Sequence, residues 1–490
     1  MRRYGAALIA TGCWWLASSS WAQTSALPPE IEAALTRAKI PLDAISLVVM
    51  DAQGAPGRTA ARLSHRASQS MNPASVMKLV TTYAALDLLG QGYAWSTPVY
   101  LDGPVVDGTL KGNLYIKGQG DPKLVLERLV LLVQRIQALG IQQIDGNIVL
   151  DRSAFDVPDL DPAKFDGEPL RPYNATPDAL LINFKAIIFK FSPDRAKGVA
   201  HVSSEPPLAD VQIPTSVPLL KGNCADYRSA LKADFSNPQL VRFDGSYAAS
   251  CGERIWPIAY VEPKAYAARA VEGMWKNQGG KLSGAVVYGQ VPARLRPTFE
   301  HPSPPLAELV RDINKFSNNV MAQQVLLTLG RTQAPAAAAA GRTTARSEPR
   351  ATFEASRSVI QRWWSDRLPL APAPLLENGS GLSRIERIQP QALAQMLQSA
   401  YQSTVSAELL ASLPIAGVDG TLRHSKARST QGSAQLKTGS LDDVAAIAGY
   451  VLGNSGKRYV LVAIANHPTP GVVNAARPVF DALIEWTQAD

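Results

Sequence analysis

The stretch NPASVMKLVTTYAALDLLG, residues 72–90, decides how the rest of the sequence is interpreted. Asn72 and Pro73 suit the N-cap and the first helical position, and the closing glycine suits a stop. The pattern predicts a helix with Ser75 and Lys78 on one face of its first turn. A helix start favours an anion, and a lysine of lowered pKa can accept a proton from a serine hydroxyl, which makes the serine a nucleophile. The same pair also fits an ordinary capped helix with a solvated lysine.

The Ser-x-x-Lys spacing is weak evidence alone, because a second copy occurs at Ser229 and Lys232. Two further triplets follow the first copy: Ser317-Asn318-Asn319 in a predicted helix–loop region, and Lys437-Thr438-Gly439 at the end of a predicted strand. Ser-x-x-Lys, Ser-x-Asn and Lys-Thr-Gly, in this order, are the signature of serine β-lactamases and penicillin-binding proteins. The ordered set therefore predicts an active site, and the copy at Ser229 is interpreted as a chance match.

With this set, the chain resembles the D-alanyl-D-alanine carboxypeptidase/endopeptidase family, the class C low-molecular-mass penicillin-binding proteins. Ser317 follows Ser75 by 242 positions, which matches a large insertion in that family. The Ala-rich stretch 331–350 departs from it. Four other stretches also look like the family: GQGDPKL (118–124), GNIVLDRSAFD (146–156), NGSGLSR (378–384) and LPIAGVDGTLR (413–423).

The resemblance implies roles for the motif residues. Ser75 would be the nucleophile, Lys78 the general base, and Ser317 the relay of a proton to the leaving amine. The other implied roles are binding of the peptide amide by Asn319, positive charge from Lys437, binding of the terminal carboxylate by Thr438, close approach of the strand at Gly439, and an oxyanion hole from the backbone N–H groups of Ser75 and Ser440. Asp151, Phe155 and Arg384 are implied as residues of the substrate cleft.

The implied chemistry is acyl transfer in two steps. The serine attacks the carbonyl of the penultimate D-alanine of a peptidoglycan stem peptide, and water then releases the acyl group. The leaving amine is D-alanine in carboxypeptidation or a neighbouring stem peptide in endopeptidation. The expected ligands are peptidoglycan peptides and β-lactam antibiotics, with no metal or other cofactor and no nucleic acid.

The implied fold is α/β (α+β): a serine β-lactamase/transpeptidase-like domain in which helices flank an antiparallel sheet, plus a large β-rich inserted region. We expect the catalytic domain to comprise residues 23–95 and 290–490, and the inserted region, 96–289, to form two subdomains. Runs rich in β-branched residues near residue 48 and over 433–466 predict the sheet, and helices near both chain ends would pack on it.

Residues 1–22 have the composition of a secretory signal peptide: Arg2 and Arg3, an apolar run, then small residues before a cleavage site after Ala22. A membrane anchor would need a longer apolar run, and Cys13 sits in a poor lipobox. We therefore expect a periplasmic protein with at most peripheral membrane contact.

Cleavage lowers the formal net charge from +8 to +6, which suits anionic surfaces, although a solvated basic surface is the simpler interpretation. The oligomeric state is left open.

Cys224 and Cys251 remain after cleavage. In an oxidising compartment they are expected to form a disulfide, and two buried thiols are the alternative. Their spacing is not that of a redox or zinc motif.

Three rival functions share part of this pattern. A serine β-lactamase has the same three motifs, and a non-catalytic wall-binding sensor could use the same fold. A Ser-His-Asp hydrolase is disfavoured because the five histidines lie in no recognisable motif and NGSGL lacks the glycine two before Ser380. His-Glu-x-x-His is absent, which removes sequence support for a zinc peptidase.

Overall fold

The computed structural model describes residues 27–333, 349–427, 432–468 and 471–490. The predicted signal peptide, 1–22, lies outside these residues, as does most of the Ala-rich stretch. In the described part of the chain, every helix is too short or too polar to cross a bilayer.

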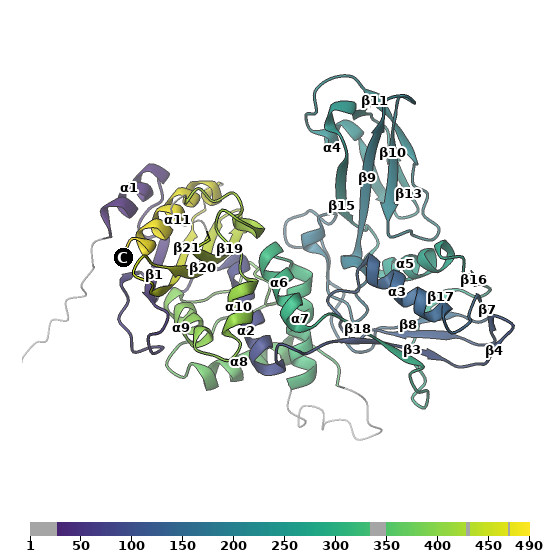
Figure 1. The fold of residues 1–490 in the computed structure, drawn as a ribbon, viewed down its shortest axis with the longest axis horizontal. Helices are drawn as coiled ribbons and strands as arrows, with labels where there is room; N and C mark the ends of the chain where they lie inside the picture. The colour runs from purple at the N-terminus through teal and green to yellow at the C-terminus, as the bar shows by residue number, and fades with distance from the viewer. Residues whose placement is uncertain (1–26, 334–348, 428–431, 469–470) are drawn as a thin grey trace, which may run out of the picture.

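One antiparallel sheet joins the beginning of the chain to its end (Figure 1). The sequence predicted this arrangement from the apolar run near residue 48 and the three runs over 433–466. The strands, in spatial order, are β19 (Ala434–Leu441), β20 (Val444–Leu452), β21 (Arg458–Asn466), β1 (Ile45–Asp51) and β2 (Leu63–His65).

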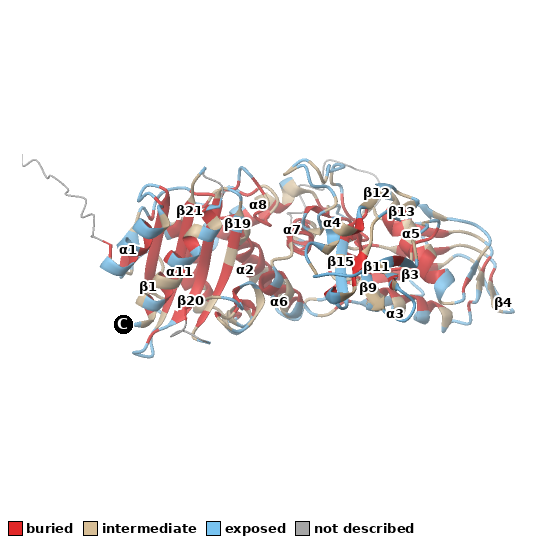
Figure 2. Ribbon diagram, turned by 90° about the horizontal axis from the view of Figure 1, so that it is seen from above, coloured by how far each residue is buried: buried red, intermediate tan, exposed pale blue. Residues whose placement is uncertain are grey.

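Both faces of this sheet are covered. Successive side chains of β1 point to opposite faces, and most of them are apolar and buried, so each face needs a cover. Leu47 and Val49 share a core with helices α1 (Pro29–Ala38) and α11 (Val472–Gln488). Val48 and Met50 point to the opposite core, which includes α2 (Lys78–Leu89) and α9 (Pro390–Tyr401). The central strands are therefore buried, as the red ribbons of Figure 2 show.

A turn at Ser317 separates two helices within the stretch 303–330, which agrees with the helix–loop region predicted for the Ser-x-Asn triplet. Helix α6 (Leu306–Phe316) ends at Ser317, which has a left-handed φ of 57°. Helix α7 (Asn319–Gln333) then begins, and the Asn318 side chain accepts from the Met321 N–H at 3.1 Å. This capping turn places Ser317 between the two helices instead of inside one. Helices α8 (Phe353–Arg367) and α10 (Ser406–Ser412) complete this part.

The inserted region is entered and left by two paired strands. Strand β3 (Ser96–Leu101) pairs with β18 (Phe299–Pro302), so this sheet runs past the predicted boundary at residue 289. Helices α3 (Leu126–Gln137) and α5 (Pro263–Asn277) form one hydrophobic core with this sheet. The other strands are β6 (Leu114–Lys117), β8 (Ile148–Asp151) and β17 (Val286–Tyr288), with the short β4 (Val105–Val106), β5 (Thr109–Leu110), β7 (Gln143–Ile144) and β16 (Lys281–Leu282) in a neighbouring sheet.

A second lobe of the inserted region projects away from these helices (Figure 1). Cys224 and Cys251 form a disulfide in it, across a sequence separation of 27. Its elements are β9 (Ala186–Asp194), β10 (Val199–Glu205), β11 (Ser216–Leu220), α4 (Tyr227–Leu231), β12 (Ala233–Asn237), β13 (Leu240–Phe243), β14 (Tyr247–Ala248) and β15 (Arg254–Ala259). Both lobes share one hydrophobic core, and their division into subdomains stays a prediction.

Candidate active site

Ser75 lies in a tight 3₁₀ turn, η1 (Ala74–Met77), that runs directly into α2. The predicted cap needs correction, because Pro73 occupies the N-cap position of this turn and Asn72 precedes it. The Asn72 side chain still accepts the Ala74 N–H at 2.9 Å. Ala74 has a left-handed φ of 46°, so the backbone turns sharply just before Ser75. The stop at Gly90 is as predicted.

Lys78 is fully buried behind this serine and its ammonium group has three partners. Its Nζ lies 2.9 Å from Ser75 Oγ, 2.6 Å from Asn319 Oδ1 and 2.5 Å from the Ser380 carbonyl oxygen. The alternative of a solvated surface lysine is therefore wrong. Three oxygens hold Lys78 Nζ in place against the hydroxyl that it would deprotonate.

The pKa of Lys78 is lowered well below its usual value. Burial is the main cause, because it disfavours the charged form. The nearby Lys437 lowers this pKa further, and Glu386 opposes both effects. Burial and Lys437 therefore favour the neutral amine, which is the form of lysine that acts as a base.

Lys437, on strand β19, lies beside Ser317. Its Nζ donates to Ser317 Oγ at 2.9 Å and to the Thr438 carbonyl oxygen at 2.7 Å. It is fully buried, and burial lowers its pKa to about 7. Each of the two lysines thus faces one serine hydroxyl.

The side chain of Asn319 makes hydrogen bonds both to Lys78 and to the inserted region. Its Oδ1 accepts from Lys78, and its Nδ2 donates to the Tyr173 carbonyl oxygen at 2.9 Å. Tyr173 belongs to the inserted region, so that region contributes a backbone atom to the arrangement. No sequence pattern indicates this contact, because a backbone carbonyl is common to every residue type.

Strand β19 passes very close to the serine. A Cβ at Gly439 would lie 2.6 Å from the Pro73 carbonyl oxygen and 3.0 Å from the Ser75 nitrogen, so only glycine fits. The Thr438 hydroxyl lies 2.7 Å from that of Thr421. Ser440, next along the strand, is exposed.

These groups open into a cleft of about 260 Å³. Arg384, one of the predicted cleft residues, lines it and packs its guanidinium 4.5 Å from the centre of the Phe165 ring. The lining residues include Ser75, Ser317, Asn319 and Ser440, together with Phe165, Asp166 and Tyr173 of the inserted region, which sequence reasoning missed.

Comparison with known proteins agrees with this arrangement. Residues 27–488 match the D-Ala-D-Ala carboxypeptidase 3 (S13) family. The chain belongs to this family. It is a serine-type hydrolase of the D-Ala-D-Ala carboxypeptidase class. This confirms both the family resemblance and the function predicted from the three motifs.

Individual relatives of this S13 peptidase cover most of its length. The D-alanyl-D-alanine carboxypeptidase of Actinomadura sp. (strain R39) is 26% identical, over 96% of this chain and 87% of the relative. D-alanyl-D-alanine carboxypeptidase DacB of Haemophilus influenzae is 25% identical, over 83% of each chain. The crystal structure of penicillin binding protein 4 (dacB) from H. influenzae matches with a TM-score of 0.70 at 22% identity, covering 93% of this chain and 99% of that one, which confirms the predicted fold class.

Two predicted cleft residues lie elsewhere in the S13 peptidase. The buried Asp151 carboxylate accepts the backbone N–H groups of Ser153 and Val291, at 2.8 and 2.9 Å. Phe155 is buried in a small apolar cluster with Ala154 and Leu327. Neither residue is among those that line this cleft, and their part in substrate binding stays a prediction.

The NGSGLSR stretch (378–384) contributes backbone contacts to the active site as well as the Arg384 side chain. The Ser380 carbonyl holds Lys78, and a Cβ at Gly381 would lie 1.9 Å from the Ala74 carbonyl oxygen and 2.6 Å from the Ser75 nitrogen. Thus the 377–383 loop, like strand β19 at Gly439, packs directly on the serine turn. The two glycines in this stretch were the signal that could have revealed it.

The second Ser-x-x-Lys copy has a different environment. Ser229 Oγ donates to Asp226 Oδ2 at 2.6 Å, and Asp226 caps helix α4. This capping was not expected from the sequence. Lys232 follows the helix in a left-handed conformation and is exposed, so the pair does not form a buried lysine–serine contact.

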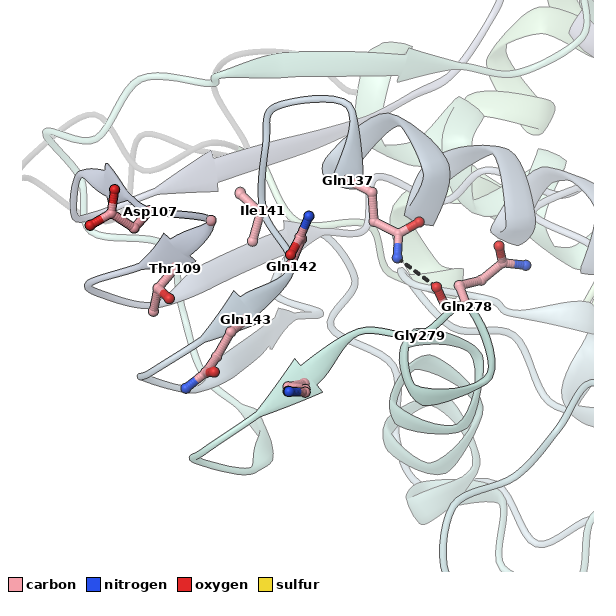
Figure 3. A pocket seen from close by; sticks show the side chains of 10 residues that line it. Asp107, Thr109, Gln137, Ile141, Gln142, Gln143, Gln278 and Gly279 are labelled. Atoms are coloured by element: carbon pink, nitrogen blue, oxygen red, sulfur yellow. Dashed lines mark hydrogen bonds between the residues drawn. The ribbon is translucent and has the colours of Figure 1, made fainter.

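A second, larger cleft of about 440 Å³ lies in the inserted region (Figure 3). It is lined largely by amide side chains, and Gln137 Nε2 donates to the Gln278 carbonyl oxygen at 2.9 Å. Within the described residues, no cluster of histidine, cysteine and carboxylate side chains could hold a metal ion.

Proposed function

We propose that Ser75 is the acylated nucleophile of this S13 peptidase and that Lys78 is its general base. The observation that carries the proposal is the 2.9 Å contact between Lys78 Nζ and Ser75 Oγ, made by a lysine with no exposed surface. Burial and the neighbouring Lys437 favour the neutral amine, which can take the serine proton as the hydroxyl attacks.

The remaining groups fit the later parts of the reaction. Ser317 contacts Lys437 and faces the cleft, so it can pass a proton to the leaving amine. The backbone N–H groups of Ser75 and Ser440 would stabilise the oxyanion. Lys437 and Thr438 would bind the terminal carboxylate of the substrate, with Asn319 binding the peptide amide.

The substrate we propose is the D-alanyl-D-alanine terminus or cross-link of a peptidoglycan stem peptide, and β-lactams would acylate Ser75 as substrate analogues. The relatives named D-alanyl-D-alanine carboxypeptidases support the first part. A crystal structure of penicillin binding protein 4 of H. influenzae in complex with a β-lactam shares the fold, with a TM-score of 0.68.

We propose that the enzyme acts in the periplasm after removal of residues 1–22. The disulfide between Cys224 and Cys251 supports export, because disulfides persist in oxidising compartments. We further propose that 23–95 and 290–490 form the catalytic domain and that the inserted region completes its cleft through Tyr173 and its neighbours.

Digestion of purified peptidoglycan tests the function. The products are separated and identified by mass spectrometry, and the control is the same digestion with Ser75→Ala. Loss of one alanine from pentapeptides shows carboxypeptidation, and loss of cross-linked dimers shows endopeptidation. Unchanged peptidoglycan, together with rapid repeated hydrolysis of β-lactams, would establish the β-lactamase alternative. An absence of both activities would favour the wall-binding sensor.

A further inference from the structure

A buried carboxylate holds the loop that faces Ser75. Glu386 has no exposed surface, and its Oε1 accepts three backbone N–H groups, from Glu377 at 3.0 Å, Asn378 at 3.0 Å and Gly379 at 2.8 Å. Its Oε2 is buried and has no hydrogen-bond partner among the described residues. Buried carboxylates are rare because desolvation is costly, so a buried glutamate calls for an explanation.

The loop that Glu386 holds, 377–383, forms one wall of the active site. Its Ser380 carbonyl accepts from Lys78, and its Gly381 packs on the backbone of Ser75. From the other side, the Thr81 hydroxyl of α2 donates to the Gly379 carbonyl oxygen at 2.7 Å. The position of the Ser380 carbonyl is therefore fixed between helix α2 and the Glu386 carboxylate.

The charge of Glu386 also acts on Lys78. Burial and Lys437 lower the pKa of Lys78, and Glu386 is the group that raises it. The pKa of Glu386 itself is raised, mainly by burial, and the three N–H groups and Lys78 oppose this shift by favouring the carboxylate. The other charged groups around this loop have partners of their own. The Glu377 carboxylate accepts from the Ser383 hydroxyl, Arg357 of α8 donates to the Glu377 carbonyl, and Arg387 donates to the carbonyls of Arg384 and Glu386.

We propose that Glu386 is a positioning residue for acylation: its buried carboxylate anchors the 377–383 loop against the Ser75 turn and so holds the Ser380 carbonyl against Lys78. This inference rests on the proposed role of Lys78 as the base. Glu386 does not touch the substrate in this account, and it acts only through the loop and through the electric field at Lys78.

Glu386→Gln separates the charge from the geometry, because an amide oxygen can still accept the three N–H groups. The rate constant for acylation by a fluorescent penicillin is measured as a function of pH. Without the negative charge, Lys78 loses its proton more readily, so the acid limb of the profile should move to lower pH. The maximal rate should stay within about threefold of that of the unmodified enzyme. The matched control is Glu377→Gln, which changes a carboxylate of the same loop and should leave the acid limb in place.

Glu386→Ala removes the anchor as well, and its maximal acylation rate should fall at least about tenfold. If this variant does not fold, Glu386→Asp replaces it, because its shorter side chain draws the carboxylate away from the three N–H groups and should also slow acylation. An acid limb that does not move in Glu386→Gln would overturn the electrostatic part, and full acylation by a folded Glu386→Ala would overturn the anchoring part. Both comparisons require that the unmodified enzyme is acylated at Ser75, as identified by peptide mass spectrometry. Absence of that acylation would contradict the proposed function instead.

Discussion

The side-chain amide of Asn319 donates a hydrogen bond of 2.9 Å to the backbone carbonyl of Tyr173. This bond leaves the amide oxygen facing Lys78, at 2.6 Å. The amide orientation at the proposed active site is therefore set by a residue of the inserted region.

Asn319→Asp should impair acylation. A carboxylate would place an oxygen against the Tyr173 carbonyl and a negative charge against Lys78, which raises the pKa of the base. We expect the acylation rate at pH 7 to fall by at least about tenfold and the acid limb to move to higher pH. The control is Asn318→Asp, since Asn318 accepts a backbone N–H that a carboxylate also accepts. Acylation of Asn319→Asp at the normal rate would show that the amide is not required.

Gly439→Ala should disrupt the contact between strand β19 and the serine turn. The new methyl group would lie 2.6 Å from the Pro73 carbonyl oxygen, so either backbone must move. We expect a loss of acylation of about 100-fold. Gly92→Ala is the matched control, because nothing lies within 4 Å of a Cβ there, and it should be nearly neutral. Equal acylation by both variants would mean that the close approach is not needed.

Lys437→Met should stabilise the fold while abolishing activity. Burial lowers the pKa of Lys437 to about 7 in the folded state, so holding the proton there costs stability. That cost is fully present below pH 7 and fades as the pH rises toward the unfolded-state pKa near 10.5. We expect unfolding in urea to show a gain of roughly 2–4 kcal/mol for Lys437→Met at pH 6 and a smaller gain at pH 9. A gain that does not shrink with pH would rule out a titrating lysine as its source.

Loss of the disulfide should affect stability and leave acylation unchanged. The bond closes a loop with a sequence separation of 27, in a lobe that holds no residue of the cleft. In the chain-entropy model its removal costs about 3 kcal/mol. Cys224→Ser/Cys251→Ser should therefore melt at a lower temperature and still be acylated at the normal rate, as measured by differential scanning calorimetry and penicillin labelling. A slower acylation at a temperature where the variant is folded would connect this lobe to the active site.

Sequence reasoning located the motif residues because each depends on the side chain itself. A nucleophilic serine, a lysine three positions later and a Lys-Thr-Gly triplet can be recognised from residue identity alone. The apolar, β-branched run of β1 predicted a strand, and helices near both chain ends were expected to pack on its sheet, as α1 and α11 do. A helix–loop region was predicted around Ser317, but the residues where each helix ends were not, because both helices continue the same apolar pattern and only the Asn318 cap interrupts it.

Contacts made by the backbone were missed for a physical reason. The carbonyls of Tyr173 and Ser380 orient Asn319 and Lys78, and any residue could supply them. Asp151 lies in a stretch resembling the family but faces backbone N–H groups, which no sequence pattern reveals. Glu386 was missed because an isolated glutamate usually lies on the surface.

The central claim is that Ser75 carries the acyl group, and mass spectrometry of the intact protein after exposure to a penicillin tests it most directly. The unmodified enzyme should gain the mass of one penicillin, and tryptic peptides should place it on Ser75. Ser75→Ala should gain nothing, while Ser229→Ala, which alters the second Ser-x-x-Lys copy, should be labelled normally. Labelling of Ser75→Ala, or an adduct on any other residue, would contradict the account.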